Sequence, residues 1–148
     1  MKVTRLETFL LSAPLPQPVR TSTHRITQVS EVVVRLATDA GPVGIGEAHG
    51  PFLFQPGADG LRGVRDILAA ITPLVVGQDP FDVERIWQEL FALTYTSVRG
   101  IPTLARQQRP LVTAMSAIDI ALWDLKGKAV VRPVWALLGG ALRRRVPA

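Results

Sequence analysis

Hydrophobic and polar positions alternate along the first third of the chain, which indicates β-strands. The clearest segment is Glu31–Asp39, in which the even-numbered residues 32 to 36 form one apolar face. Val3–Leu11 is rich in β-forming residues, although its alternation is less regular, and Val43–Ala48 follows a Gly-Pro turn. Because that turn is short, the second and third segments should pair as a hairpin. The pattern therefore predicts an antiparallel meander of three strands.

Two segments next to these strands lack a regular period, and we expect both to be loops. Ser12–Gln28 contains three prolines followed by the polar run Arg20–His24. The second segment, His49–Gly57, carries Phe52 and Phe54 among glycines and prolines. Long loops in compact domains are usually functional or disordered. Two aromatic side chains in such a segment favour a lid or a docking surface.

The rest of the chain has the period of α-helices. Apolar residues recur at helical spacing from Leu61 until Pro73, which should end that helix. Asp79-Pro80 is a helix-start signal for the next one. Pro110–Lys128 gives the strongest helix, and a short apolar segment, Pro133–Leu138, follows it. Three strands followed by a helical bundle make an α+β fold.

Part of the apolar surface has no obvious place in this small fold. Trp123 lies off the apolar stripe of its helix, and Val134, Trp135, Leu137 and Leu138 form a second apolar cluster. Surplus apolar surface usually marks a contact with another domain or subunit. We therefore expect such a contact near the end of the chain.

Composition narrows the class of protein. The 148 residues are 47% hydrophobic and 20% charged, which suits one globular domain and excludes a disordered chain. There is no cysteine, which excludes disulfides, thiolate nucleophiles and cysteine-ligated metals. The sequence has neither a run of about 18 apolar residues nor a signal-type apolar core near Met1. We expect a cytoplasmic protein with no membrane partner.

The net charge of +5 raises nucleic acid as a partner. The arginines are scattered, however, and the one dense run, Arg143–Arg145, has no aromatic residues interleaved with it for base stacking. We therefore expect no nucleic-acid partner, and we expect the arginines to form solvated surface or to meet a protein surface.

The glycine-rich step Gly44-Ile-Gly46-Glu47-Ala48-His49-Gly50 invites comparison with dinucleotide-binding loops. Its third glycine falls one residue late, and the segment leads into a loop instead of the helix start that phosphate binding needs. The alternative is that these glycines allow another backbone to pack closely on the strand.

Other catalytic patterns have little support in these residues. Glu47 and His49 should share a strand face and could bind a metal with His24, but no established ligand spacing supports such a site. No nucleophile elbow is present. Asp119 and Asp124 lie five residues apart on a helix, so we do not expect a catalytic carboxylate pair.

One segment of the chain reads Ala114-Met-Ser-Ala-Ile-Asp-Ile-Ala-Leu-Trp-Asp-Leu-Lys-Gly-Lys128 and is continued by Pro133-Val-Trp-Ala-Leu-Leu-Gly139. It resembles the signature of the mandelate racemase/muconate lactonizing group of the enolase superfamily. Gly44-Ile-Gly46-Glu47-Ala48 is similar to the G-x-G-E step that ends a strand in that family. The resemblance runs over essentially the whole chain, and the order of elements agrees with it.

The resemblance implies that residues 1–129 are an N-terminal capping domain and that residues 130–148 are a linker and the start of a C-terminal (β/α) barrel. In this family, two loops of the capping domain close over the substrate. At the corresponding positions we expect substrate-binding roles for Arg20, Thr21, His24, His49 and Phe52. The family's catalytic groups and Mg²⁺ ligands lie on barrel strands, so we expect no catalytic or metal-binding residue in this chain, which would be a fragment or a truncated product.

The function that the resemblance implies is abstraction of a proton α to the carboxylate of a small substrate, supported by Mg²⁺. An acid-sugar dehydratase is the first expectation, because Arg20, Thr21, His24 and His49 would give the capping loops a polar face. A racemase, an epimerase or a muconate lactonizing-like cycloisomerase is the alternative. A stand-alone, non-catalytic interaction module is an alternative of another class. We also expect a homo-oligomer, with a barrel domain or partner subunit against the free apolar surface.

Overall fold

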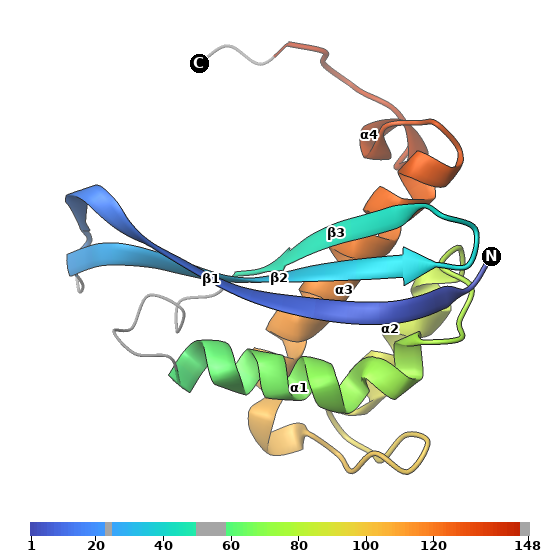
Figure 1. Ribbon diagram of the computed structural model, residues 1–148, viewed down its shortest axis with the longest axis horizontal. Helices are drawn as coiled ribbons and strands as arrows, with labels where there is room; N and C mark the ends of the chain where they lie inside the picture. The colour runs from blue at the N-terminus through green and yellow to red at the C-terminus, as the bar shows by residue number, and fades with distance from the viewer. Residues whose placement is uncertain (23–24, 50–58, 146–148) are drawn as a thin grey trace.

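The central strand β2 (Arg25–Thr38) pairs antiparallel with β1 (Val3–Arg20) on one side and with β3 (Val43–Ala48) on the other. This arrangement belongs to a computed structural model that describes residues 1–22, 25–49 and 59–145. The register places Val32 opposite Leu10 and Ala48. The predicted three-stranded meander is therefore confirmed, and the helices lie beside one face of it (Figure 1).

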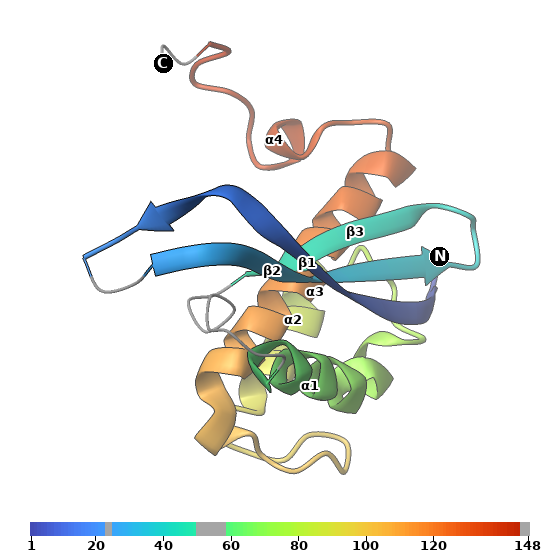
Figure 2. The same ribbon diagram turned by 60° about the vertical axis from the view of Figure 1, so that its left-hand side comes forward.

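The predicted loop Ser12–Gln28 is wrong over most of its length, because both strands continue into it. β1 reaches Arg20 and β2 begins at Arg25, so the two form a long hairpin that extends beyond the end of β3 (Figures 1 and 2). Pairing is regular from Arg5 to Pro14, which lies opposite Gln28, and the register shifts before Val19 pairs with Ile26. The three prolines are tolerated because β1 is an edge strand, where half of the backbone N–H groups have no strand to bond.

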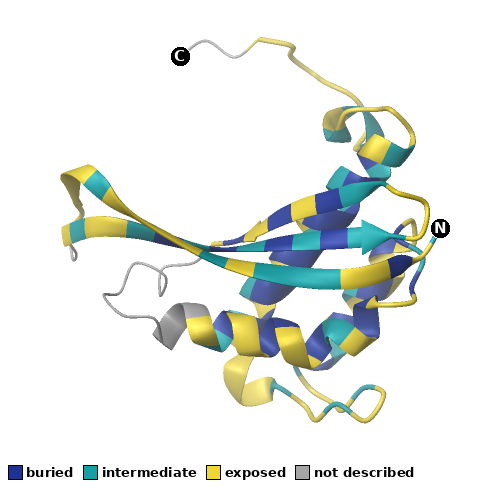
Figure 3. Ribbon diagram, in the orientation of Figure 1, coloured by how far each residue is buried: buried dark blue, intermediate teal, exposed yellow. Residues whose placement is uncertain are grey.

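The two faces of the sheet differ in burial, as the alternation predicts. Val32, Val34 and Leu36 are fully buried against the helices, and intermediate or exposed residues lie between them (Figure 3). On the opposite face, Phe9 and Ile45 are exposed. Helix packing therefore covers only one face.

Strand β3 lies directly on α3 (Gln108–Ala129) at its two glycines. A Cβ atom at Gly44 would lie 2.0 Å from the carbonyl oxygen of Ala121, and one at Gly46 would lie 1.9 Å from that of Ala117. Since no side chain fits at such distances, only glycine allows this approach. The packing interpretation of the glycine-rich step is confirmed.

The outer edge of β3 is bonded by side chains of α3. Asp124 Oδ2 accepts a hydrogen bond from the backbone N–H of Ile45 at 2.8 Å. Lys128 Nζ donates to the carbonyl oxygen of Val43 at 3.0 Å and to Asp124 Oδ2 at 2.6 Å. The Asp124–Lys128 pair thus satisfies edge-strand backbone groups that would otherwise be left without a protein partner.

Helix α1 (Asp59–Val75) runs two residues past the predicted stop at Pro73. Its end is set by Gly77, which has a φ of 86° and donates its N–H to the carbonyl oxygen of Val3 at 2.8 Å. A proline near the end of a helix removes one backbone bond without forcing the chain to turn. The left-handed glycine is what ends the helix.

The next helix, α2 (Val83–Ala92), begins later than the Asp79-Pro80 signal predicts. Asp79 Oδ1 accepts a hydrogen bond from the N–H of Phe81 at 3.0 Å, so it stabilises a turn that precedes the helix. A short 3₁₀ helix, Ala105–Gln107, leads into α3, and α4 (Val134–Leu137) forms a single turn after it. The helical part of the expected α+β fold is confirmed, with these boundaries corrected.

Candidate functional site

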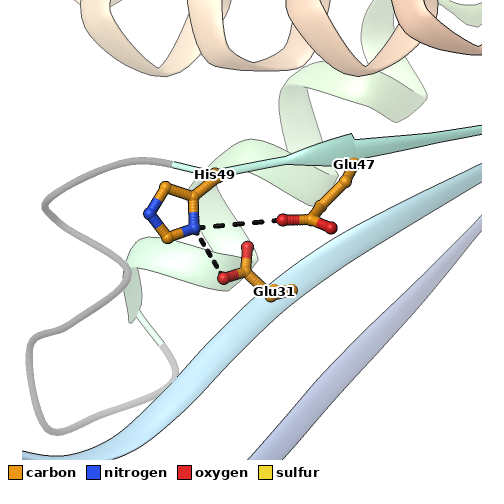
Figure 4. A group of neighbouring side chains, drawn as sticks. All are labelled: Glu31, Glu47 and His49. Atoms are coloured by element: carbon orange, nitrogen blue, oxygen red, sulfur yellow. Dashed lines mark hydrogen bonds and ion pairs between the residues drawn. The ribbon is translucent and has the colours of Figure 1, made fainter. Parts of the chain in front are cut away.

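Two neighbouring strands bring three ionisable side chains together on the helix-free face of the sheet. Glu31 belongs to β2, Glu47 belongs to β3, and His49 comes directly after β3. The potential ligand atoms of the three side chains all lie within 4.8 Å of one another, and the side chains converge (Figure 4). We refer to Glu31, Glu47 and His49 as the carboxylate–imidazole cluster.

The members of the cluster differ in contacts and burial. His49 Nδ1 lies 2.6 Å from Glu31 Oε1 and 4.0 Å from Glu47 Oε1. The side chain of Glu31 is only 17% exposed, whereas those of Glu47 and His49 are 55% and 49% exposed. The second carboxylate oxygen of Glu31, Oε2, is buried and has no hydrogen-bond partner among the described residues.

Sequence reasoning placed Glu47 and His49 on one face correctly but did not include Glu31. The register of the β2–β3 hairpin could have indicated that Glu31 lies near His49. Residue numbers of paired positions in β2 and β3 add up to 80, as for Val32 with Ala48. Counting one step further outward from the turn sets Glu31 beside His49.

The other site residues expected from the sequence are not part of this cluster within the part of the chain that the structure describes. Arg20 and Thr21 lie at the far end of the β1–β2 hairpin and are exposed to solvent. Figure 1 shows this end well beyond β3. His24 and Phe52 lie outside the described residues.

Asp119 on α3 is the described carboxyl group with a perturbed pKa. Burial raises its pKa above the ordinary value of 3.8, and the negative charge of Glu84 raises it further. It borders a cleft of about 400 Å³, whose other lining residues are Ile120, Trp123, Asp124, Val134 and Leu138. Asp124 shares this cleft although the two residues are five positions apart, but its carboxylate is engaged by Ile45 and Lys128.

Among the described residues, no helix is both long enough and apolar enough to cross a membrane.

The sequence and structure resemble known proteins over nearly the whole chain. Residues 5–139 match the family model of the mandelate racemase/muconate lactonizing enzyme N-terminal domain. D-galactarolactone cycloisomerase of Agrobacterium fabrum is 36% identical over 149 aligned positions, covering 100% of this chain and 35% of the relative. D-galactonate dehydratase of Klebsiella pneumoniae is 35% identical over 116 positions, covering 78% of this chain and 26% of the relative.

A solved structure gives the same result for the fold. L-talarate/galactarate dehydratase from Salmonella typhimurium, liganded with Mg and L-lyxarohydroxamate, superposes with a TM-score of 0.75 at 26% identity. The match covers 96% of this chain and 34% of that one. The chain thus spans about a third of the length of the proteins it resembles. It belongs to the mandelate racemase/muconate lactonizing enzyme family of the enolase superfamily and corresponds to the N-terminal domain of that family.

Proposed function

We propose that this chain is the substrate-capping domain of an acid-sugar dehydratase-like enzyme that abstracts a proton α to a carboxylate. The observation that carries the proposal is the set of names among its relatives. D-galactonate, galactarate and D-galactarolactone occur in the names of proteins that match this chain over 78% to 100% of its length. Sugar acids and their lactones are therefore the proposed substrate class.

The end of the β1–β2 hairpin supplies chemistry suited to such a substrate. The guanidinium of Arg20 can donate two parallel hydrogen bonds to a carboxylate, and the hydroxyl of Thr21 can bond a sugar hydroxyl. Both side chains are exposed on a hairpin that extends beyond the sheet, so a second domain could receive them. We propose that they bind substrate, with His49 on the neighbouring segment. The roles of His24 and Phe52 remain predictions.

The described residues do not fit the Mg²⁺ ion that the family implies. Their one cluster of three candidate ligands includes the imidazole nitrogen of His49. Mg²⁺ prefers six oxygen ligands in an octahedron. We therefore propose that the Mg²⁺ ligands and the catalytic bases lie outside these residues, in a barrel domain that residues 130–148 would lead into. Residues 1–148 alone should be inactive.

A cycloisomerase or racemase is the second candidate. The cycloisomerase of Agrobacterium fabrum aligns with the whole chain at an identity similar to that of the dehydratase. The reactions share proton abstraction and differ in the fate of the intermediate that it forms. Dehydration removes one water from the substrate, whereas isomerisation leaves its mass unchanged.

The test is an assay of the protein produced with all coding sequence that lies beyond codon 148 in its gene. With Mg²⁺ and D-galactonate, galactarate or D-galactarolactone, mass spectrometry should detect a product lighter by one water. A product of unchanged mass would favour the isomerase candidate. Absence of turnover on every acid sugar and lactone would contradict both.

The capping role has its own test in the same protein. Arg20→Ala should raise KM about tenfold or more, because a charged hydrogen-bonding partner of the substrate is lost. Arg62→Ala, on the exposed face of α1, is the matched control and should leave KM unchanged. Equal kinetics of the two variants would remove Arg20 from the substrate site.

A further inference from the structure

We propose that the carboxylate–imidazole cluster binds a divalent transition-metal ion of the Zn²⁺ type. Glu31, Glu47 and His49 offer one ligand atom each, and these atoms lie within 4.8 Å of one another. Bonds of about 2.1 Å to a tetrahedral ion would place ligand atoms about 3.4 Å apart. The two half-exposed side chains, Glu47 and His49, lie on the sheet face that carries no helix. Small rotations of these side chains would bring the ligand atoms to the spacing that the ion requires.

An independent observation is that one carboxylate oxygen of Glu31 lacks a hydrogen-bond partner among the described residues. Its Oε2 atom is buried and has no donor within the described chain, although buried carboxylate oxygens are normally bonded. The hydrogen-bonding contact with His49 involves the other oxygen, Oε1. A metal ion bound by this carboxylate would supply the missing partner. An ion pair with His49 alone leaves Oε2 unsatisfied.

The charges of the neighbourhood also favour a cation. The cluster contains two acidic side chains, Glu31 and Glu47, and one imidazole. Among the described ion pairs, neither Glu31 nor Glu47 has a lysine or arginine partner, and their shared partner is His49. Arg35 lies on the same face but pairs with Glu7. A divalent ion would balance the cluster.

The donor set indicates which ion. An imidazole nitrogen is a ligand that suits Zn²⁺ and its first-row neighbours, whereas Mg²⁺ prefers oxygen alone. Because two of the three side chains are about half exposed, positions on the ion would stay open to water. The ion would join β2 to the residue directly after β3. This site is separate from the Mg²⁺ site of the family. It shares His49 with the proposed substrate-binding residues, so metal binding and not turnover is the readout of its test.

The experiment is calorimetric titration of the full-length protein with Zn²⁺ in the presence of excess Mg²⁺, so that oxygen-only sites are filled. We expect one Zn²⁺ bound for each chain through this site. His49→Gln and Glu31→Gln should each weaken binding about tenfold or more, since a ligand is lost. Co²⁺ in place of Zn²⁺ should give visible absorption bands that disappear in His49→Gln, which is a readout independent of activity.

His24→Gln is the matched control, because it removes the only other imidazole of the chain. It should bind Zn²⁺ as the unchanged protein does. Circular dichroism establishes that each variant is folded, and Glu47→Gln, at an exposed position, serves if Glu31→Gln fails to fold. The proposal is overturned if the unchanged protein binds no Zn²⁺, if His49→Gln binds it equally well, or if only His24→Gln loses it.

Discussion

At the scale of single residues, Gly46 determines how closely β3 approaches α3. We expect Gly46→Ala to destabilise the fold by about 3 kcal/mol or more, because its Cβ would lie 1.9 Å from the carbonyl oxygen of Ala117 and the backbone cannot yield cheaply. Denaturant unfolding measures the change. Gly63→Ala is the control, since a Cβ there meets nothing within 4 Å and helix propensity should stabilise it by about 0.5–1 kcal/mol. Similar effects of both substitutions would contradict the close packing.

A second prediction at this scale concerns Asp119 and the pH dependence of the stability of the fold. Its pKa is raised above 3.8 in the folded protein by burial and by Glu84. The folded protein therefore holds this proton more tightly than the unfolded chain, so stability falls as pH rises from about 3.8 through the raised value. Asp119→Asn removes this loss.

Thermal melts at several pH values check the prediction. The melting temperature of Asp119→Asn should rise relative to that of the unchanged protein as pH increases from about 3.5 to 7. Asp66→Asn, at an exposed carboxyl group of α1, is the control for the removal of one negative charge. A constant difference between Asp119→Asn and the unchanged protein would show that Asp119 ionisation is not coupled to folding.

At the scale of elements, the β3 edge depends on the side chains that bond it. Asp124→Ala should destabilise the protein by about 1–3 kcal/mol, because the Ile45 N–H loses its acceptor and Lys128 loses its charged partner. Hydrogen exchange should show faster exchange at the amide of Ile45. Asp66→Ala is the control, because Asp66 contacts only its neighbour Arg65 among the hydrogen bonds described. An unchanged exchange rate at Ile45 would contradict this role of Asp124.

The β1–β2 hairpin shows where element prediction failed and why. Prolines at 14, 16 and 18 read as a loop because proline cannot donate to a sheet ladder. That loss matters only where a neighbouring strand would accept the bond, and β1 has a neighbour on one side only. Local sequence does not state whether a strand is at the edge. The same limit explains the boundaries of α1 and α2, which are set by Gly77 and by the turn that Asp79 stabilises.

At the scale of the whole molecule, apolar side chains remain exposed around α4. Trp135 is 51% and Leu138 64% exposed, and Leu138 borders the cleft beside Trp123. This agrees with the surplus apolar cluster expected from the sequence. Such surface is typical of contacts with another domain or subunit.

We therefore expect residues 1–148 on their own to self-associate through this surface. The double variant Trp135→Gln/Leu138→Gln should elute later in size-exclusion chromatography and bind less of a hydrophobic dye, with little change in melting temperature. Tyr95→Gln is the control, since Tyr95 is also exposed but lies after α2. A monomeric, cooperatively melting chain before any substitution would contradict the expectation and favour a stand-alone module.

The sequence by itself determined the inner face of the sheet, the positions of the main helices and the family. These features depend on hydrophobic periodicity, which is local in the sequence, and on short motifs. In the motif Gly44-Ile-Gly46-Glu47, the glycines are required by one close contact with α3. Only the tertiary structure decided that β1 is an edge strand, that Glu31 joins Glu47 and His49, and that Asp119 is partly buried and close enough to Glu84 to feel its charge. Each of these depends on which segment lies alongside, and register and burial arise from packing between residues distant in the chain.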